Sequence, residues 1–434
     1  MALRVIPTVC IGIVLCTFVN LLWDDDFQTD SYLYPYLFTP AHMTKVNGMA
    51  VTFAMDMEYI YVEKPDGYSV KRAEAILAEY EDKENTDDKK DINEIDSDLP
   101  NIIVIMNEAF SDLSVLGNFT VNQDYMPFVH RLQLGYENTI IGNLEVSVCG
   151  GNTANSEFEF LTGYTMDYFP VGSIPYQQYI TKELPSMASQ LKALGYKTYG
   201  MHPYNASGWQ RDTVYPLLGF ETSYFLHDFE NKVYIRNYVS DWTAYDKIIR
   251  TYEAKEAGTP MFAFEVTMQN HSGYTEAHEN FSPDVHVEEL DSFEVDQYLS
   301  LMKVSDAELE RLVNYFAAEE EKTMIVFFGD HQPNDSIANK IFRLNGKDAS
   351  QMSVEDAKQR YQVPYVIWAN FDIAEAKNVD TDISFLGTEA LQAAGVPLTA
   401  YQRFLLDLKA NPDSEEYLEK YQILQYYFMF DYAE

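Results

Sequence analysis

Short apolar runs separated by amphipathic segments make up most of the chain after residue 100. Apolar residues recur at helical spacing in 184–194 and 296–318, which predicts helices between such runs. The alternation of strand and helix predicts an α/β fold with a mostly parallel central sheet flanked by helices. The runs have the length of strands that are buried on both faces, and they cover residues 102–106, 196–201, 261–267, 323–328 and 364–369.

A long apolar run lies at the N-terminus. Residues 5–23 carry no charged side chain and as a helix would span roughly 28 Å at ~1.5 Å per residue, about one hydrocarbon thickness. Because basic residues stay on the cytoplasmic side, Arg4 before the run predicts that the body lies outside the cell, with Trp23 at the outer interface. A cleaved signal peptide is the alternative, but the run is long for one and lacks a small-x-small cleavage site. We therefore predict a single-pass membrane anchor.

The remaining sequence predicts a segmented chain. Residues 24–62 are rich in aromatic residues and Met without a clear period, so they are interpreted as a segment that packs on the body or on the membrane surface. A helical pattern in 69–80 is followed by a charged, low-complexity stretch, 81–98, that is typical of a linker. The predicted parts are an anchor, a juxtamembrane segment with linker, a globular domain and a small C-terminal subdomain, over residues 1–23, 24–99, 100–370 and 371–434.

Composition limits the possible partners and metal ligands. The 434 residues include 68 acidic and 30 basic side chains, and a net charge of -38 excludes nucleic acid as a partner because the phosphate backbone would be repelled. With 47% hydrophobic and 15% aromatic residues the chain can bury a large core. Three Cys allow no disulfide framework and no four-thiolate metal site, so any metal must be held by oxygen and imidazole. An extracellular protein without disulfides indicates a Gram-positive-like bacterial surface.

Polar residues directly after two of the predicted strands are candidate metal ligands. Glu108 follows the run 102–106, and Asp330 and His331 follow 323–328. In an open α/β sheet, ligands bind beyond the carboxyl ends of the strands, so these three side chains are expected to meet there. Two oxygen ligands and one nitrogen suit Mn²⁺, Zn²⁺ or Mg²⁺. The alternative is that Asp330 caps a turn and His331 is merely exposed.

A glycine-rich turn supplies a candidate nucleophile. In VCGGNTANSEFEFLTG, two glycines lead into Thr153 and a predicted helix over 154–161, whose N-terminal N–H groups would attract phosphate. A Thr hydroxyl is a poor nucleophile until a bound cation lowers its pKa, so this hypothesis requires the metal. The alternative is an ordinary helix N-cap. Cys149 lacks the Cys-x-Pro-x-Arg context by which sulfatases make formylglycine and is expected to pack in the loop.

Four more residues follow strand-like runs and are expected at the same edge of the sheet: His202, Trp209, Arg211 and His271. Arg211 offers forked donors for phosphate oxygens, and His271 could bind a phosphoryl group or act as acid or base. Each has an ordinary alternative: a core position for Trp209, an acidic partner such as Asp212 for Arg211, and satisfied polar positions for the histidines. Together they predict a basic pocket that would admit an anionic substrate to an acidic protein.

With these residues considered together, the chain resembles the lipoteichoic acid synthase family, phosphoglycerol transferases of the alkaline phosphatase and sulfatase superfamily. Five motifs carry the resemblance from about Pro100 onward: NEAFSD, GGNTANSEFEFLTG, GWQRD, QNHSGY and GDHQPN. The resemblance implies a sulfatase-like fold and one divalent ion, usually manganese, with Thr153 as the nucleophile. It also implies two sets of site residues: metal ligands Glu108, Thr153, Asp330 and His331, and a glycerol phosphate pocket of His202, Trp209, Arg211 and His271.

The resemblance further implies a membrane-anchored extracellular enzyme that moves glycerol phosphate from phosphatidylglycerol to a lipoteichoic-acid-type or glycan acceptor through a threonine-bound intermediate. Relatives commonly have several membrane helices where this chain has one predicted span, and Met106 and Tyr204 replace a His and an Asp that some synthases carry. These two changes leave the head group and the formation of a polymer open. The alternatives are a phosphoethanolamine transferase or phosphodiesterase with the same threonine and metal, and a catalytically silent surface protein that binds lipid.

Overall fold

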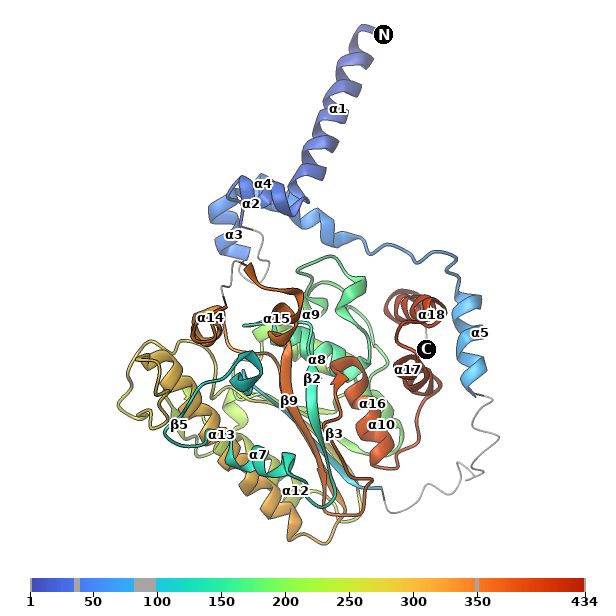
Figure 1. Ribbon diagram of the computed structural model, residues 1–434. Coiled ribbons are helices and arrows are strands. Elements are labelled where there is room, and N and C mark those ends of the chain that lie inside the picture. The colour runs from blue at the N-terminus through green and yellow to red at the C-terminus, as the bar shows by residue number, and fades with distance from the viewer. Residues whose placement is uncertain (1, 35–39, 82–98, 348–350, 433–434) are drawn as a thin grey trace.

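The computed structural model describes residues 2–34, 40–81, 99–347 and 351–432 and shows a central sheet with helices on both sides (Figure 1). Within the described residues the main sheet has nine strands in the order β10-β2-β9-β8-β1-β7-β3-β4, with β11 paired to β2. Their bounds are β1 Asn101–Asn107, β2 Thr139–Glu145, β3 Lys197–Met201, β4 Thr222–Tyr224, β7 Met261–Val266, β8 Thr323–Gly329, β9 Gln362–Ala369, β10 Ala376–Lys377 and β11 Thr381–Asp382. A separate hairpin joins β5, Tyr234–Ile235, to β6, Tyr238–Val239.

The predicted α/β fold with a mostly parallel sheet is confirmed. Strands β4, β3, β7, β1 and β8 run parallel, and all five predicted apolar runs are strands. Within this mostly parallel sheet, β9 is antiparallel to both β8 and β2. An apolar run shows that a strand is buried but not which way it runs.

Alternate residues of each central strand enter two separate hydrophobic cores. In β1, Ile102, Val104 and Met106 point into one core, and Ile103 and Ile105 point into the other. The first core lies under α5 Val70–Glu81, α8 Thr153–Thr162, α10 Met187–Ala193, α11 Arg211–Leu217, α16 Ile383–Ala393, α17 Ala400–Ala410 and α18 Glu415–Tyr426. The second lies under α7 Pro127–Gln133, α12 Asp241–Ala254, α13 Phe293–Ala317 and α14 Asp335–Leu344. Helices over both faces explain why the strand runs are continuously apolar.

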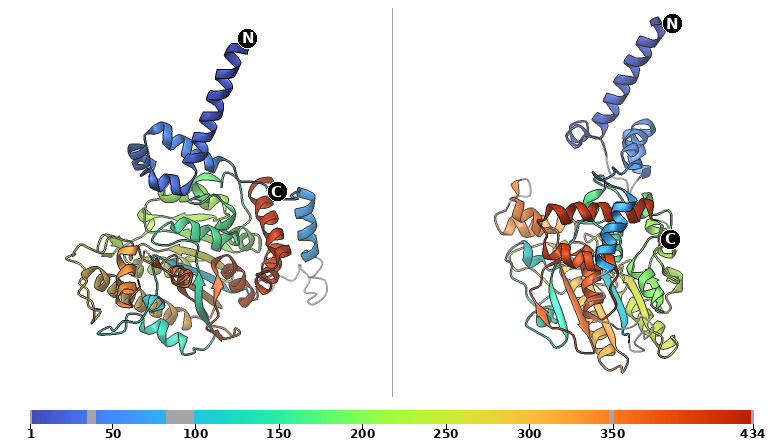
Figure 2. Two further views of the ribbon diagram at one scale, coloured as in Figure 1. Left: turned by 45° about the horizontal axis from the view of Figure 1, so that its top comes forward. Right: turned by 90° about the vertical axis from the view of Figure 1, so that its right-hand side faces the viewer.

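Two segments outside the predicted globular domain pack against it. Helix α5 buries Ala73, Ile76 and Tyr80 in the first core, and Figures 1 and 2 show it beside the C-terminal helices. Strands β10 and β11 pair with β2, so the C-terminal region extends the same sheet. Most of the charged stretch predicted as a linker, residues 82–98, lies outside the described residues.

The N-terminal region is helical. Helix α1, Ala2–Leu22, projects away from the body, and three helices follow it: α2 Asp25–Asp30, α3 Pro40–Asn47 and α4 Met49–Asp56 (Figure 1). A small core of Leu22, Met43 and Met55 holds the start of this region together. Among the helices that the structure describes, none has the length and hydropathy needed to cross a membrane.

The ends of β1 and β8 approach closely because Gly329 has no side chain. A Cβ atom at Gly329 would lie 1.9 Å from the carbonyl oxygen of Phe110, in the segment that follows β1. Non-bonded carbon and oxygen atoms do not approach this closely, so a residue with a side chain must push the two strand ends apart. Glycine at this position therefore sets the distance between the segments that follow the two strands.

We expect Gly329→Ala to lower the free energy of unfolding by at least about 1–3 kcal/mol, because the added methyl group meets rigid backbone. Urea unfolding of the variant and the parent protein measures this difference. Gly12→Ala is the control, since its methyl group would meet no atom within 4 Å. Equal unfolding midpoints for Gly329→Ala and the parent would show that the strand ends can separate without cost.

Candidate active site

Two neighbouring parallel strands deliver acidic residues to one edge of the sheet. Strands β1 and β8 pair in register, with Asn107 opposite Gly329. Glu108 and Asp330 are the next residues of each strand, so both leave the sheet at its carboxyl edge. This is the edge at which ligands bind in open α/β sheets.

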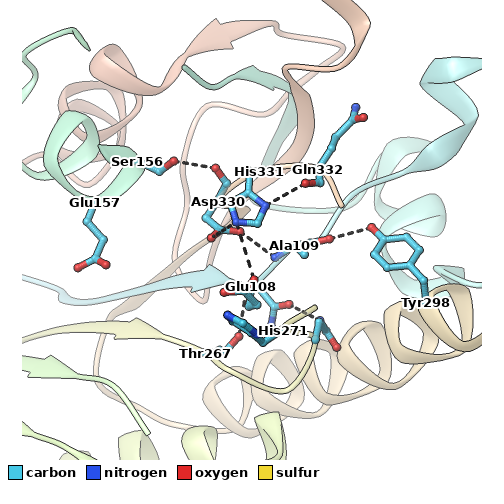
Figure 3. A network of polar contacts seen from close by, with 12 residues as sticks. Glu108, Ala109, Ser156, Glu157, Thr267, His271, Tyr298, Asp330, His331 and Gln332 are labelled. Carbon is cyan, nitrogen blue, oxygen red and sulfur yellow. Dashed lines mark hydrogen bonds and ion pairs between the residues drawn. The ribbon is translucent and has the colours of Figure 1, made fainter. Parts of the chain in front are cut away.

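Glu108, Asp330 and His331 form a buried cluster at this edge (Figure 3). Each offers one ligand atom, and these atoms lie within 4.8 Å of one another. His331 Nε2 is 3.1 Å from Asp330 Oδ2 and 3.8 Å from Glu108 Oε1. The three side chains that the sequence suggested as metal ligands are thus close enough to share one ion.

The hydrogen bonds of the cluster leave two atoms free to bind a cation. His331 Nδ1–H donates to the carbonyl oxygen of Gln332 at 2.9 Å, which turns the lone pair of Nε2 toward the cluster. Asp330 Oδ1 accepts the N–H of Ala109 at 2.8 Å. Asp330 Oδ2 and His331 Nε2 are buried and have no hydrogen-bond partner among the described residues. Such orphaned acceptors are rare, and two at one point fit a metal ion.

The electrostatics of the cluster also favour a cation. Burial, and after it the negative charge of Asp330, raises the pKa of Glu108 to about 8. Two carboxylates held this close out of water repel each other, and a divalent ion between them would remove the repulsion. An oxygen, oxygen and nitrogen donor set accepts Mn²⁺, Zn²⁺ or Mg²⁺, so the choice of manganese remains a prediction.

The start of helix α8, with Thr153 as its first residue, is bonded to the segment that carries two of the cluster residues. Ser156, one turn into α8, donates its hydroxyl to the carbonyl oxygen of Asp330 at 2.7 Å (Figure 3). Before the helix, Gly150 N–H donates to the carbonyl oxygen of Gln332 at 3.0 Å. One hydrogen bond before Thr153 and one after it therefore hold this residue beside the cluster.

A pocket of ≈ 510 Å³ joins the cluster to the other predicted site residues. Seven of the eight residues predicted from the sequence line this pocket, and Asp330 belongs to the cluster at its wall. The structure therefore gathers all eight in one place, while the role of each remains a prediction. The lining includes Glu108, Thr153, His202, Trp209, Arg211, His271 and His331, together with Cys149, Tyr204 and Tyr274.

Arg211 is paired with an acid that sequence reasoning did not identify. Its Nε lies 3.0 Å from Glu157 Oε1 and 3.2 Å from Oε2, and its terminal NH2 group also donates to Glu157. Tyr215 donates to the same carboxylate at 2.9 Å. Both partners are buried, Arg211 at 2% and Glu157 at 0% side-chain exposure. One side of the guanidinium fork is thus occupied, which reduces the donors that Arg211 can offer to a phosphate.

The two pocket histidines on the substrate side are expected to be neutral. Burial and the charge of Arg211 lower the pKa of His202 well below its usual value, and its Nδ1–H donates to the carbonyl oxygen of Val266 at 2.9 Å. Burial also lowers the pKa of His271. Its Nδ1 is buried without a hydrogen-bond partner among the described residues. A neutral His271 can accept a proton as well as donate one.

Arg236 holds the loop that carries His271 and was not found from the sequence. Its guanidinium donates to the carbonyl oxygens of Gln269, His271 and Gly273 at 2.9, 2.8 and 3.1 Å. It comes from the turn of the β5–β6 hairpin with a φ of 54°, a value that side-chain-bearing residues rarely adopt. Strands of two residues show no hydrophobic period, so no pattern could mark this position.

A buried polar network links the residues that precede Glu108 and His271. Asn270 Nδ2 donates to Asn107 Oδ1 at 2.9 Å, and Asn107 Nδ2 donates to Asp241 Oδ2 at 2.9 Å. All three side chains are buried. Because Glu108 and His271 follow these residues directly, the network fixes the metal ligand relative to the pocket histidine.

Acidic and imidazole side chains at the carboxyl edge of an α/β sheet, beside a hydroxyl at a helix start, form an arrangement that is typical of metal-dependent phosphotransferases and sulfatases. The sequence model of the Sulfatase family matches residues 100–396, and the chain belongs to that family. This membership confirms the enzyme class that the five motifs predicted. The family name does not imply a formylglycine, since Cys149 lacks the motif for it.

Curated relatives share part of their length with this chain. A putative cyclic beta-1,2-glucan modification protein of Rhizobium meliloti is 30% identical over 397 residues, 89% of this chain and 56% of that protein. The lipoteichoic acid synthase of Staphylococcus saprophyticus is 27% identical over 271 residues, 59% of this chain and 40% of the synthase. The chain therefore spans about half the length of the curated relatives it matches.

Solved structures share the fold. The phosphoglycerol transferase GacH of Streptococcus pyogenes, in complex with sn-glycerol-1-phosphate, has a TM-score of 0.70 at 22% identity and covers 86% of this chain and 96% of that one. The lipoteichoic acid synthase LtaP of Listeria monocytogenes has a TM-score of 0.55 at 20% identity, over 74% of this chain and 78% of that one. These matches agree with the alkaline phosphatase type of fold.

We expect Glu108→Gln to weaken Mn²⁺ binding by at least about 10–100-fold, because a ligand contributes no less than an outer-shell partner. Isothermal titration of the metal-stripped proteins measures the dissociation constants. Glu159→Gln is the matched control: Glu159 is equally buried, but its oxygens accept the hydroxyl of Ser147 and the N–H of Met166. Equal Mn²⁺ affinity in Glu108→Gln and the parent would refute the metal site.

We expect Arg236→Lys to increase amide hydrogen exchange in residues 269–273 by roughly tenfold, the equivalent of one hydrogen bond of about 1.4 kcal/mol. Lysine keeps the positive charge but cannot reach three carbonyl oxygens from one planar group. Hydrogen exchange followed by mass spectrometry measures the loop directly. Arg311→Lys on the exposed face of α13 is the control. Unchanged exchange in the Arg236 variant would mean that other contacts hold the loop.

Proposed function

We propose that this protein is a metal-dependent phosphoglycerol transferase that moves glycerol phosphate from phosphatidylglycerol to a lipoteichoic-acid-type or glycan acceptor. The observation that carries the proposal is the attachment of the α8 start to the metal-ligand segment through Ser156 and Gly150. It puts the Thr153 hydroxyl in one pocket with Glu108 and His331. Family membership and the similarity to a phosphoglycerol transferase and a lipoteichoic acid synthase support phosphotransfer.

A divalent ion, manganese in this proposal, would be held by Glu108, Asp330, His331 and Thr153, and when bound would lower the pKa of the Thr153 hydroxyl and stabilise charge on the phosphoryl oxygens. Thr153 Oγ attacks the phosphorus of the donor, its hydroxyl proton passes to the neutral His271 or to a water molecule, and the bond from phosphorus to the diacylglycerol oxygen breaks. His271 or a water molecule gives the leaving oxygen its proton. The product is diacylglycerol and a glycerophosphoryl group on Thr153.

The second half reaction reverses the first with a different alcohol. An acceptor hydroxyl attacks the same phosphorus, its proton passes to His271 or water, and the threonine oxygen takes that proton back as the Thr153 Oγ–phosphorus bond breaks. His202, Trp209, Arg211 and His271 line the pocket and are proposed to hold the glycerol phosphate group. Glu157 already balances the charge of Arg211. We therefore propose that Arg211 orients the substrate phosphate through hydrogen bonds and adds little net electrostatic attraction.

We further propose that the N-terminal segment anchors the protein at the cell membrane, with the catalytic domain on the outside of a Gram-positive-type bacterial cell. The uncharged run 5–23, with Arg4 before it and acidic residues after it, supports this orientation. Helix α1 extends away from the body, as a tether would (Figure 1). An enzyme held at the membrane would meet its lipid donor at high local concentration.

We expect Thr153→Ala to lower turnover of phosphatidylglycerol by at least about 10³-fold, because removal of a nucleophile leaves only binding and positioning. Release of diacylglycerol by the Mn²⁺-loaded protein measures turnover, and mass spectrometry of the tryptic peptides locates the adduct. Thr162→Ala is the matched control: it lies on the same helix, and the two side chains are similarly exposed, at 8% for Thr153 and 7% for Thr162.

A glycerophosphoryl adduct on any residue other than Thr153 would refute the assignment of the nucleophile. Phosphatidylethanolamine in place of phosphatidylglycerol distinguishes the phosphoethanolamine transferase alternative, since the mass gain on Thr153 then changes. If water is the only acceptor to which the protein transfers the group, the protein is a phosphodiesterase. A protein that binds lipid but releases no diacylglycerol at saturating Mn²⁺ would be the silent surface protein.

A further inference from the structure

Two tyrosines lie beside the pocket histidines: Tyr204 lines the active-site pocket, and Tyr238 lies behind it against Tyr204 and His271. Their ring centroids lie 6.4 Å apart, and Tyr238 is 5.1 Å from the ring of His271. On its other side, Tyr204 is 6.2 Å from the ring of His202. We name Tyr204 and Tyr238 the aromatic rim. The rim forms a continuous aromatic surface between the two histidines that flank the proposed phosphate position.

Tyr204 of the aromatic rim is open to solvent and its backbone is hydrogen-bonded on both sides, while Tyr238 is half-buried. Tyr204 is 41% exposed, although it lines the pocket. Its N–H donates to the carbonyl of His202 at 2.7 Å, and its own carbonyl accepts the N–H of Leu226 at 3.0 Å. Tyr238 lies against the guanidinium of Arg236, 5.7 Å from its ring centroid. A large aromatic side chain held exposed beside a reactive centre is a surface for a ligand.

The pocket has room for a second reactant. At ≈ 510 Å³ it is in the range that encloses a drug-sized molecule, and a glycerol phosphate group is much smaller. In a transfer reaction the attacking oxygen of the acceptor must come within about 3–3.5 Å of phosphorus. The acceptor must therefore enter through the same mouth and lie along its rim.

The charges around the pocket favour a neutral acceptor. Among the described residues that line it, Arg211 is the one Lys or Arg, and Glu157 neutralises it. Arg236, just outside, donates to loop carbonyls through its two terminal NH2 groups, but its Nε is buried without a hydrogen-bond partner among the described residues and it keeps its positive charge. The donor phosphodiester adds one negative charge, which the proposed divalent ion and Arg236 can match, whereas an acceptor chain of glycerol phosphates would add further negative charges beyond these cations. The net charge of -38 opposes the approach of such a polyanion as well.

We propose that the aromatic rim is the acceptor subsite and that the acceptor is the sugar ring of a neutral glycan. A pyranose has an apolar C–H face that packs on an aromatic ring, and hydroxyl groups at its edge that can reach the phosphorus. In the transfer step a sugar hydroxyl oxygen bonds to phosphorus, the Thr153 Oγ–phosphorus bond breaks, and the hydroxyl proton passes to the threonine oxygen. This inference rests on the proposed phosphoglycerol transfer and names its acceptor class.

The test supplies the Mn²⁺-loaded 434-residue chain with phosphatidylglycerol in mixed micelles and with laminarihexaose, a neutral glucose oligosaccharide. Mass spectrometry measures glycerol phosphate on the sugar, and free glycerol phosphate measures transfer to water. We expect Tyr204→Ala and Tyr238→Ala each to lower the ratio of sugar product to water product by about threefold to tenfold. Tyr136→Ala is the matched control, because Tyr136 is also 41% exposed and lies away from the pocket.

Two results would overturn the acceptor subsite. One is an unchanged product ratio in both rim variants, and the other is better transfer to a glycerol phosphate oligomer than to laminarihexaose. If no diacylglycerol is released at all, the proposed function fails instead. The subsite is then tested by titrating laminarihexaose into the Mn²⁺-loaded protein without donor. A dissociation constant that rises about threefold to tenfold in Tyr204→Ala supports the subsite. No binding to the parent protein, or equal affinity in the parent and the variant, refutes it.

Discussion

The burial of two acidic groups, Glu108 and Asp330, side by side at the edge of the sheet is the constraint on which the site depends. Two buried carboxylates beside an imidazole are unfavourable by themselves, and the surrounding structure keeps them together. The absence of a side chain at Gly329 brings the strand ends together, and the bonds among Asn107, Asn270 and Asp241 fix the residues below. Fold stability and cation binding are therefore coupled.

The pocket balances its charges one by one. Glu157 matches Arg211, the carbonyl oxygens of the 269–273 loop take the donors of Arg236, and burial keeps His202 neutral. A pocket whose one lining arginine is paired with an acid would recognise a substrate by shape and by a shared ion more than by the charge of that arginine. Under the proposed function, this would let a strongly acidic protein act on an anionic lipid without also binding every anion nearby.

Sequence reasoning succeeded where a residue follows a strongly apolar strand. Glu108 and Asp330 were found this way, because the buried runs before them are unambiguous and parallel strands end at one edge. The partner of Arg211 was not found, since Glu157 lies 54 residues away on a helix whose docking no local pattern encodes. Arg236 was missed because its hairpin is too short to show a period. The direction of β9 and the helices of residues 24–62 were likewise beyond local patterns.

The carbonyl oxygen of Gln332 accepts both His331 Nδ1–H and Gly150 N–H. It thereby selects one tautomer of the imidazole and tethers the threonine turn before any ion arrives. Folding alone completes the receptor, so ion uptake requires no reshaping of the backbone. The speed of loading is then governed by the water shell of the incoming ion, and Mg²⁺, which dehydrates reluctantly, enters more slowly than ions that release water readily.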